Sequence, residues 1–243
     1  MPPALSPSNH PDAPLRAAPN PHPLAWLPNA LVWLRLVLAA VFVALLSVNP
    51  LAHRSALLWA VAIFIVAALT DLLDGRLARA WNCVSRFGRI MDSFADKILI
   101  LGAFVCLAGP QFALPLESGT TSGSLVQVSG VFPWMVVLIL GRELLVTSLR
   151  GLVEGEGGDF SAITIGKLKM VAQSVAVPLI LLLLALAPQN PEQPPALVGW
   201  ANHAISITAW LTVLITVFSS LPYIHKAFAP TPHPHDHPHP PTN

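Results

Sequence analysis

Four aspartates in one stretch of this sequence have the residue type and the spacing to do chemistry. Asp71 and Asp74 are three residues apart, and Asp92 and Asp96 are four residues apart. On an α-helix each spacing places the two side chains on one face. The short link between the pairs contains Gly88, which permits a tight turn or a close approach of the backbone. Two antiparallel helices joined by this link would bring four carboxylates together.

Carboxylates this close repel one another, and the cost rises where the effective dielectric is low. Two arrangements relieve the repulsion. The acids can pair with neighbouring arginines, for which Arg79, Arg86 and Arg89 are candidates, or they can share divalent cations. Hard oxygen ligands suit Mg²⁺ or Mn²⁺.

A pair of such ions would support phosphoryl chemistry. Two metals about 3.5–4 Å apart can stabilise both the attacking and the leaving oxygen of an in-line displacement. A carboxylate at the edge of the group could accept a proton from an incoming hydroxyl, and arginines could hold the phosphates of the donor. The residues alone therefore predict phosphoryl or phosphatidyl transfer, and a structural network of ion pairs is the alternative.

The composition of the chain predicts where this chemistry occurs. Of 243 residues, 54% are hydrophobic and only 10% are charged, whereas soluble domains carry about 25% charged residues. We therefore predict an all-α, polytopic membrane protein, and a soluble helical protein with a large core is the alternative. The net charge of +1 gives no reason to expect nucleic-acid binding. The two cysteines, Cys83 and Cys106, are expected to be buried, reduced thiols.

Six hydrophobic segments are each long enough to cross a bilayer as a helix, some with tilt or with a polar end beyond the hydrocarbon. They cover residues 27–48, 55–81, 91–109, 131–153, 163–187 and 198–222. Together they define a six-helix membrane catalytic domain, residues 26–225. Residues 1–25 form a disordered Pro-rich tail, and residues 226–243 form a disordered His/Pro-rich tail. Weak transition-metal binding by the second tail is the alternative to a solvated segment without function.

Basic residues predict the orientation of the helices, because cytoplasmic loops are enriched in Lys and Arg. The connections 110–130 and 188–197 contain neither residue type. The connections on the other side carry or adjoin basic residues such as Arg86 and Arg150. We therefore expect the charged side, with the aspartates and both termini, to be cytoplasmic. Arg54, near the opposite side, is the one exception.

The spacing of these residues resembles the signature of the CDP-alcohol phosphatidyltransferase family. The chain reads Asp71-x-x-Asp74-Gly75-x-x-Ala78-Arg79, then eight residues, Gly88, three residues, Asp92, three residues and Asp96. No position of the signature is missing. The resemblance covers roughly residues 28–173, continues more weakly through the sixth segment and excludes both tails. It implies a six-helix enzyme of the bacterial inner (cell) membrane that cleaves a CDP-linked lipid and releases CMP. Homodimers are common in the family.

The same resemblance implies a role for each of these residues. Two divalent ions, Mg²⁺ or Mn²⁺, would be bound by Asp71, Asp74, Asp92 and Asp96. Asp96 would also act as the general base. The residues expected to contact CDP-diacylglycerol are Asn29, Gly75, Ala78, Arg79, Ser85 and Gly88. The residues expected only to mark the cytoplasmic side are Arg76, Arg89 and Lys97.

A second pattern indicates the acceptor alcohol. Cationic residues of the fourth and fifth segments are similar to those of the bacterial phosphatidylglycerophosphate synthase branch of the family, whose acceptor is glycerol 3-phosphate. The matching positions are Arg142-Glu143, Ser148-Leu149-Arg150, Gly166-Lys167-x-Lys169 and Gln173, with Asn29 and Arg35 in the first segment. Many members have Thr in place of Val32 and Pro in place of Ser93. Neither position supplies a metal ligand, so the reaction class is unaffected.

Arg142, Arg150 and Lys167 are expected to bind the acceptor phosphate, because this group needs cationic partners and Arg contacts phosphate in a bidentate manner. Arg142 is flanked by apolar residues and should face the bundle interior, with Glu143 pairing with another helix. For Lys169 the alternative is contact with anionic lipid. Other acceptors, such as inositol phosphate, phosphatidylglycerol or serine, stay open. So does a membrane metal transporter, although transporter sites tend to lie near the bilayer midplane.

Overall fold

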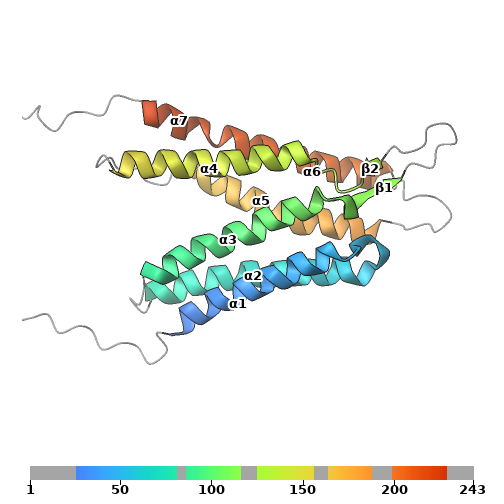
Figure 1. The fold of residues 1–243 in the computed structure, drawn as a ribbon, viewed down its shortest axis with the longest axis horizontal. Helices are drawn as coiled ribbons and strands as arrows, with labels where there is room; N and C mark the ends of the chain where they lie inside the picture. Colours follow the sequence, from blue (N-terminus) through green and yellow to red (C-terminus); the bar gives the residue numbers. More distant parts are fainter. Residues whose placement is uncertain (1–25, 81–85, 116–124, 156–163, 188–198, 229–243) are drawn as a thin grey trace, which may run out of the picture.

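The computed structural model describes residues 26–80, 86–115, 125–155, 164–187 and 199–228 (Figure 1). Some side chains within helices also fall outside the description, among them those of Asp74, Ala78, Arg79 and Lys167. The predicted N-terminal tail, Cys83, Ser85 and residues 229–243 lie outside the described residues. Residues 226–228, predicted to begin the disordered C-terminal tail, are instead helical, because they form the end of the helix Leu221–Phe228.

Six long α-helices and a shorter one make up most of the described chain. The long helices are α1 (Leu27–Ser47), α2 (Arg54–Ala80), α3 (Arg86–Leu107), α4 (Pro133–Gly155), α5 (Thr164–Leu186) and α6 (Gly199–Phe218). The shorter helix is α7 (Leu221–Phe228). Each long helix overlaps one of the six predicted segments. The mostly helical fold is therefore confirmed.

The helices pack into one elongated bundle. α1 packs along α2 and α3, α5 contacts both α2 and α6, and α4 lies against α6 and α7. Figure 1 shows α1, α2 and α3 on one side of the bundle, α4, α6 and α7 on the other, and α5 crossing between them. α1 begins and α7 ends at the same end of the bundle (Figure 1).

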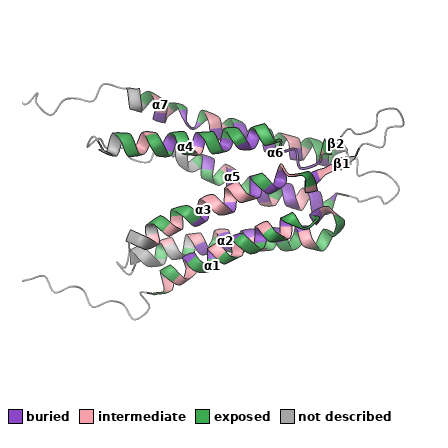
Figure 2. Ribbon diagram, in the orientation of Figure 1, coloured by how far each residue is buried: buried purple, intermediate pink, exposed green. Residues whose placement is uncertain are grey.

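Four helical stretches are long and apolar enough to cross a membrane. Among the described residues these are Asn29–Ser47, Arg54–Asp71, Leu168–Leu186 and Trp200–His225, and no more than 44% of any stretch is buried. Exposed residues run along the outer faces of the helices (Figure 2), and many of them are large and apolar. Such a surface favours lipid over water. α3 and α4 are also long enough to cross a membrane, with 22 and 23 residues, but their charged residues lower their hydropathy. That these two helices cross the membrane stays a prediction.

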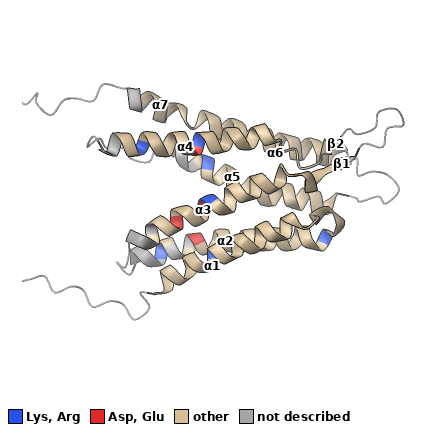
Figure 3. Cartoon of the chain, in the orientation of Figure 1, with Lys and Arg blue, Asp and Glu red and all other residues tan. Residues whose placement is uncertain are grey.

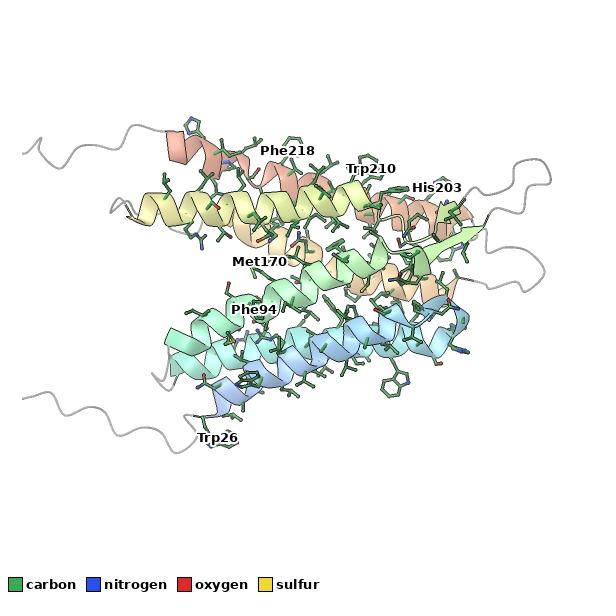
Figure 4. The ribbon with its side chains drawn as sticks, viewed as in Figure 1. Trp26, Phe94, Met170, His203, Trp210 and Phe218 are labelled. Carbon is green, nitrogen blue, oxygen red and sulfur yellow. The ribbon has the colours of Figure 1, made fainter. Side chains whose placement is uncertain are left out.

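Aromatic side chains project from this surface. Trp26, at the start of α1, is 62% exposed, and Trp59, towards the other end of the bundle, is 66% exposed. Figure 4 shows Trp26 pointing away from the bundle, with Trp210 and Phe218 on the outer side of α6. Tryptophan is enriched where a membrane meets water. This placement supports a bundle surrounded by lipid.

Small residues are buried on both α1 and α2, which pack along each other. Ala39, Ala60 and Ala67 are completely buried, as is usual where helices pack within a membrane. On the same two helices, the rings of Phe42 and Phe64 lie with their centroids 5.5 Å apart and their planes at 55°, a tilted arrangement that aromatic pairs favour. These contacts fix α1 against α2 and so position the polar residues closer to their charged ends.

The all-α prediction misses a small β-ribbon at the end of the bundle opposite the charged residues. β1 (Ala113–Pro115) pairs antiparallel with β2 (Leu125–Gln127). The side chains of Gln127 and Ser129 donate hydrogen bonds to the carbonyl oxygen of Leu107 at 2.6 and 2.5 Å. They satisfy a carbonyl that the end of α3 would otherwise leave without a partner. Three-residue strands are too short to show the period-two pattern by which a strand is predicted.

The sixth predicted segment is divided in two at Ser219 and Ser220, between α6 and α7. Each serine hydroxyl donates a hydrogen bond to a backbone carbonyl three residues earlier, at 2.7 and 2.6 Å. Pro222 follows and has no N–H to continue the helical ladder. Local side-chain bonds and a proline therefore end one helix and start another.

Candidate active site

The charged residues gather at one end of the bundle. Figure 3 shows most of the described Lys, Arg, Asp and Glu residues on α2, α3, α4 and α5, in the part of the bundle nearer the end where α1 begins. Arg54, at the start of α2, lies at the opposite end, as the sequence predicts. Within this charged end the structure separates an acidic group on α2 and α3 from a basic group centred on α4 and α5.

Arg35 lies at the centre of the acidic group. It is the only charged residue of α1, and its side chain is completely buried. Its Nη1 atom lies 2.8 Å from Oδ1 of Asp71, 2.6 Å from Oδ1 of Asp92 and 3.5 Å from Oδ1 of Asp96. Asp71 comes from α2, and the other two acids come from α3. Three helices therefore meet at one guanidinium.

The structure thus brings three of the four predicted aspartates to one point. Their carboxylates are partly exposed, with 26–41% of each side chain accessible, so a ligand can reach them. Asp74 lies one turn after Asp71 on α2, and its side chain is outside the described residues. Its proximity to the other acids stays a prediction from the spacing.

The residues predicted to bind the nucleotide lie near the same end, as far as the structure describes them. Gly75 follows Asp74 on α2, and Gly88 is in the first turn of α3; both are half-buried. Asn29 is exposed in the first turn of α1. Ala78 and Arg79 are on the last turn of α2, but their side chains lie outside the described residues. Their contacts with a donor stay predictions.

A cavity of about 140 Å³ lies beside Asp96. Its polar lining comes from Ser93, Asp96 and Lys97 of α3, Glu143 of α4, and Lys169 and Gln173 of α5. Figure 4 shows Met170, part of its apolar lining, between α5 and α3. The cavity therefore joins the acidic group to the basic one.

An ion pair between Lys169 and Glu143 forms part of the cavity lining. Only 9% of the lysine side chain and 13% of the glutamate side chain are exposed. The prediction that Glu143 pairs with another helix is confirmed. Lys97, expected only to mark the cytoplasmic side, also lines the cavity. Its Nζ donates a hydrogen bond to Oγ1 of Thr147 at 3.4 Å.

Arg142 is buried and faces the bundle interior, as predicted. Its Nη2 atom donates a hydrogen bond to Oγ of Ser219 at 3.0 Å, and its Cζ atom lies 5.8 Å from the centre of the Tyr223 ring. The side chain therefore points to the break between α6 and α7. The Nε groups of Arg142 and Arg150 are buried, and neither has a hydrogen-bond acceptor within the described part of the chain. Lys167 is in the first turn of α5, but its side chain lies outside the described residues.

The donor set of the acidic group suits a hard divalent cation. Asp71, Asp92 and Asp96 offer carboxylate oxygens, which Mg²⁺ and Mn²⁺ prefer. In their present arrangement, however, no three Asp, Glu, His or Cys side chains of the described residues are grouped so as to hold one ion. The three carboxylates converge instead on Arg35. The chemistry of these residues therefore fits a divalent ion. Their positions are those of carboxylates paired with the guanidinium of Arg35.

The place of Arg35 in the site was not predicted from the sequence, where Arg35 is only one position of the family resemblance. A signal was available, because Arg35 is the single charge in an otherwise uncharged helix of 21 residues. An ionisable residue within an apolar span is expensive and usually faces a polar partner inside the bundle. The sequence does not say which of the nearby acids that partner is.

Comparison with known proteins identifies the class. The family model for CDP-alcohol phosphatidyltransferase matches residues 25–218. The chain is 30% identical over 213 residues to a CDP-diacylglycerol–glycerol-3-phosphate 3-phosphatidyltransferase of Bacillus subtilis, covering 82% of this chain and 94% of that one. It is 35% identical over 205 residues to a probable phosphatidylglycerophosphate synthase of Mycobacterium tuberculosis, covering 84% and 82%. An Escherichia coli protein with the same name as the Bacillus one is 30% identical over 176 residues, covering 70% and 79%.

The chain belongs to the CDP-alcohol phosphatidyltransferase family. The family match covers all six long helices, including the acidic group and the cavity. Members of this family generally use divalent metal ions, in agreement with the carboxylate chemistry of the site.

Proposed function

We propose that this chain transfers the phosphatidyl group of CDP-diacylglycerol to sn-glycerol 3-phosphate, giving phosphatidylglycerophosphate and CMP in phospholipid biosynthesis. The observation that carries the proposal is the position of Asp96. Its carboxylate belongs to the acidic group and also lines a cavity with Lys97 and Lys169. A proton acceptor thus lies between a site suited to a diphosphate and one suited to a phosphorylated alcohol. The names of the relatives support the choice of glycerol 3-phosphate.

Asp96 is the general base in this proposal. Its carboxylate takes the proton from the 1-hydroxyl of glycerol 3-phosphate while the hydroxyl oxygen forms a bond to the phosphorus that carries diacylglycerol. The bond from that phosphorus to the oxygen of CMP breaks, and CMP leaves with the electron pair. A positioned carboxylate typically accelerates such a step by about 10²–10⁴-fold.

The remaining aspartates serve the donor. Asp71, Asp74, Asp92 and Asp96 would hold two divalent ions, Mg²⁺ or Mn²⁺, whose charge stabilises the diphosphate as it is cleaved. Asn29, Gly75, Ala78, Arg79, Ser85 and Gly88 would contact CDP-diacylglycerol. A residue without a side chain at position 75 leaves room for a nucleotide to lie against α2.

The acceptor phosphate binds among the cations of α4 and α5 in this proposal. Arg142, Arg150 and Lys167 are the residues expected from the sequence. The Nε donors of the two arginines have no acceptor within the described part of the chain, which suits groups that bind an anion. The cavity lining supports adding Lys169, whose ammonium group is buried beside Glu143. A phosphate there would exchange one anionic partner of Lys169 for another.

The proposed setting is the inner (cell) membrane of a bacterium, with six crossings and with the active site and both termini on the cytoplasmic side. The charged end of the bundle, where α1 begins and α7 ends, supports this orientation. Residues 26–225 would form the catalytic domain, and α7 continues from it to Phe228. The acyl chains of the donor would stay in lipid while its headgroup enters among the helices. Assembly as a homodimer is part of the proposal, since homodimers are common in the family.

The test is the release of CMP from CDP-diacylglycerol by the purified chain. The assay is run with glycerol 3-phosphate, inositol phosphate, phosphatidylglycerol or serine as the acceptor, each with and without Mg²⁺. We expect CMP and phosphatidylglycerophosphate with glycerol 3-phosphate and Mg²⁺ only. CMP release with only one of the other acceptors would show that this alcohol, and not glycerol 3-phosphate, is the acceptor. No CMP release with any acceptor would refute the proposed reaction.

A further inference from the structure

Arg35 has a position that the proposed reaction does not explain. The reaction uses carboxylates and divalent ions at the acidic group, and it needs no arginine from α1. Yet Arg35 is completely buried, and one of its nitrogens contacts all three described aspartates. A guanidinium stays protonated in proteins, so it carries a full positive charge where the proposal places metal ions.

We infer that Arg35 is the resident cation of the acidic group: it holds the three carboxylates together without a divalent ion, and divalent ions compete with it for them. The inference rests on the proposed function for the metal-binding role of the aspartates. It assigns to Arg35 a positioning role and an effect on metal affinity.

The three aspartates need a cation because their negative charges lie close together. Asp71, Asp92 and Asp96 come from two helices and direct their Oδ1 atoms at one point. Without a cation at that point the carboxylates would repel one another and separate. Arg35 supplies one positive charge to three negative ones, so the group stays assembled and still attracts divalent ions.

Arg35 in turn needs the aspartates, because its side chain is charged and completely buried. A buried charge in an apolar helix is unfavourable unless it is paired. α1 contains no other charged residue, so Arg35 depends on acids from α2 and α3. Each side of the pair therefore needs the other, and the contact ties α1 to both helices that carry the aspartates.

Arg35 and divalent cations would compete for the same carboxylate oxygens. The oxygens that contact Nη1 belong to residues that would bind the metal, and a positive charge this close to them repels a divalent cation. A purely structural ion pair would matter for stability alone. A resident cation must also lower the affinity of the aspartates for divalent ions, and this difference can be measured.

The experiment uses the full-length chain in lipid nanodiscs after treatment with EDTA. Thermal unfolding is measured in EDTA, and Mn²⁺ binding is measured by the electron paramagnetic resonance signal of free Mn²⁺. Asp71→Asn/Asp92→Asn gives the baseline for Mn²⁺ bound elsewhere, including by the His-rich C-terminal residues. Arg54→Gln, an exposed arginine at the other end of α2, is the matched control.

We expect Arg35→Gln to lower the Tm in EDTA by at least about 5 °C. We expect it to bind Mn²⁺ at least about tenfold more tightly than the natural chain, because a like charge next to the site has been removed. Mn²⁺ should then raise its Tm more than it raises that of the natural chain. Arg54→Gln should change neither quantity. An unchanged Tm in EDTA, or an unchanged or weaker affinity for Mn²⁺, would overturn the inference.

Arg35→Lys keeps the test decisive if Arg35→Gln does not fold. Lysine keeps the charge but lacks the planar fork that contacts several carboxylates. We expect a smaller loss of Tm in EDTA than for Arg35→Gln, and a Mn²⁺ affinity within about threefold of the natural chain. A Tm equal to that of the natural chain would overturn the positioning role. If the natural chain itself binds no Mn²⁺ above the baseline, the metal part of the proposed function fails instead, and CMP release tests the rest separately.

Discussion

Replacing Lys169 with glutamine should weaken the binding of the acceptor and leave the binding of the lipid donor nearly unchanged. Lys169 lines the cavity beside Asp96, and its ammonium group is buried against Glu143. The acidic group that would bind the donor lies on the other side of Asp96, around Arg35. The two substrates therefore meet different residues, and Lys169 belongs to the acceptor side.

The magnitude follows from the burial of this ion pair. A hydrogen bond to a charged group contributes about 1.5–3 kcal/mol, which corresponds to roughly 10- to 150-fold in binding. Only 9% of the Lys169 side chain is exposed, so water cannot easily replace the lost ammonium group. The carboxylate of Glu143, with 13% of its side chain exposed, would then keep only its 3.4 Å contact with Nη1 of Arg142. It would face the phosphate with less positive charge beside it, which adds to the loss.

The assay is initial-rate CMP release in mixed micelles. The KM for glycerol 3-phosphate is measured at saturating CDP-diacylglycerol, and the KM for the donor at saturating acceptor. We expect Lys169→Gln to raise the first KM by about 10- to 100-fold and the second by less than about threefold. Glu143→Gln and the double variant complete the cycle. The double variant should recover part of the loss, because it removes the carboxylate that would repel the phosphate.

Two results would refute this reasoning. An unchanged KM for glycerol 3-phosphate would mean that Lys169 does not meet the acceptor. An equal rise in both KM values would mean that the substitution disturbs the whole bundle, and Arg54→Gln provides the baseline for a lysine- or arginine-to-glutamine change that touches neither site.

Three further predictions concern the base, the metal and the fold. Asp96→Asn should lower turnover by about 10²–10⁴-fold in the CMP-release assay, and near-normal turnover with metal bound would show that Asp96 is not the base. EDTA should abolish CMP release and Mg²⁺ should restore it, whereas activity that resists EDTA would contradict metal dependence. Gly130 has a φ of +65°, and a Cβ there would meet Cγ2 of Ile205 at 3.1 Å. Gly130→Ala should therefore destabilise the fold by about 1–3 kcal/mol in thermal unfolding with both KM values retained, and an equal Tm would argue against this strain.

Most of the helical framework could be predicted from the sequence because lipid imposes a simple rule. A backbone in hydrocarbon must satisfy its own hydrogen bonds, so a long apolar run becomes a helix. The break at Ser219 and Ser220 escaped this reasoning, because two serines and Pro222 interrupt the helix without lowering the apolar character around them. The short ribbon between α3 and α4 escaped it too, because its strands have three residues each.

The acidic group was predicted from spacing alone, and the structure brings Asp71, Asp92 and Asp96 together as expected. Helical periodicity places residues on a face, and a short link brings two faces together. It does not say which residue of a third helix meets them. As the only charge of α1, Arg35 is marked by the sequence as needing a buried polar partner, but only the structure shows that these aspartates are that partner. The same limit applies to the pairing of Glu143 with Lys169. The sequence predicted that Glu143 would have a partner on another helix without indicating which residue it is.

The position of α3 explains how one bundle can bring a diphosphate and a phosphorylated alcohol together. Asp96 and Lys97 are neighbours in the sequence, and both line the cavity. The carboxylate of Asp96 also lies 3.5 Å from Nη1 of Arg35 in the acidic group, while Nζ of Lys97 lies 3.4 Å from Oγ1 of Thr147 on α4. Side chains of one helical turn therefore reach toward α1 on one side and α4 on the other. An in-line displacement requires the nucleophile and the leaving group on opposite sides of the phosphorus. α3 meets this requirement by separating the acidic group around Arg35, suited to the diphosphate, from the cavity with Lys97 and Lys169, suited to the phosphorylated alcohol.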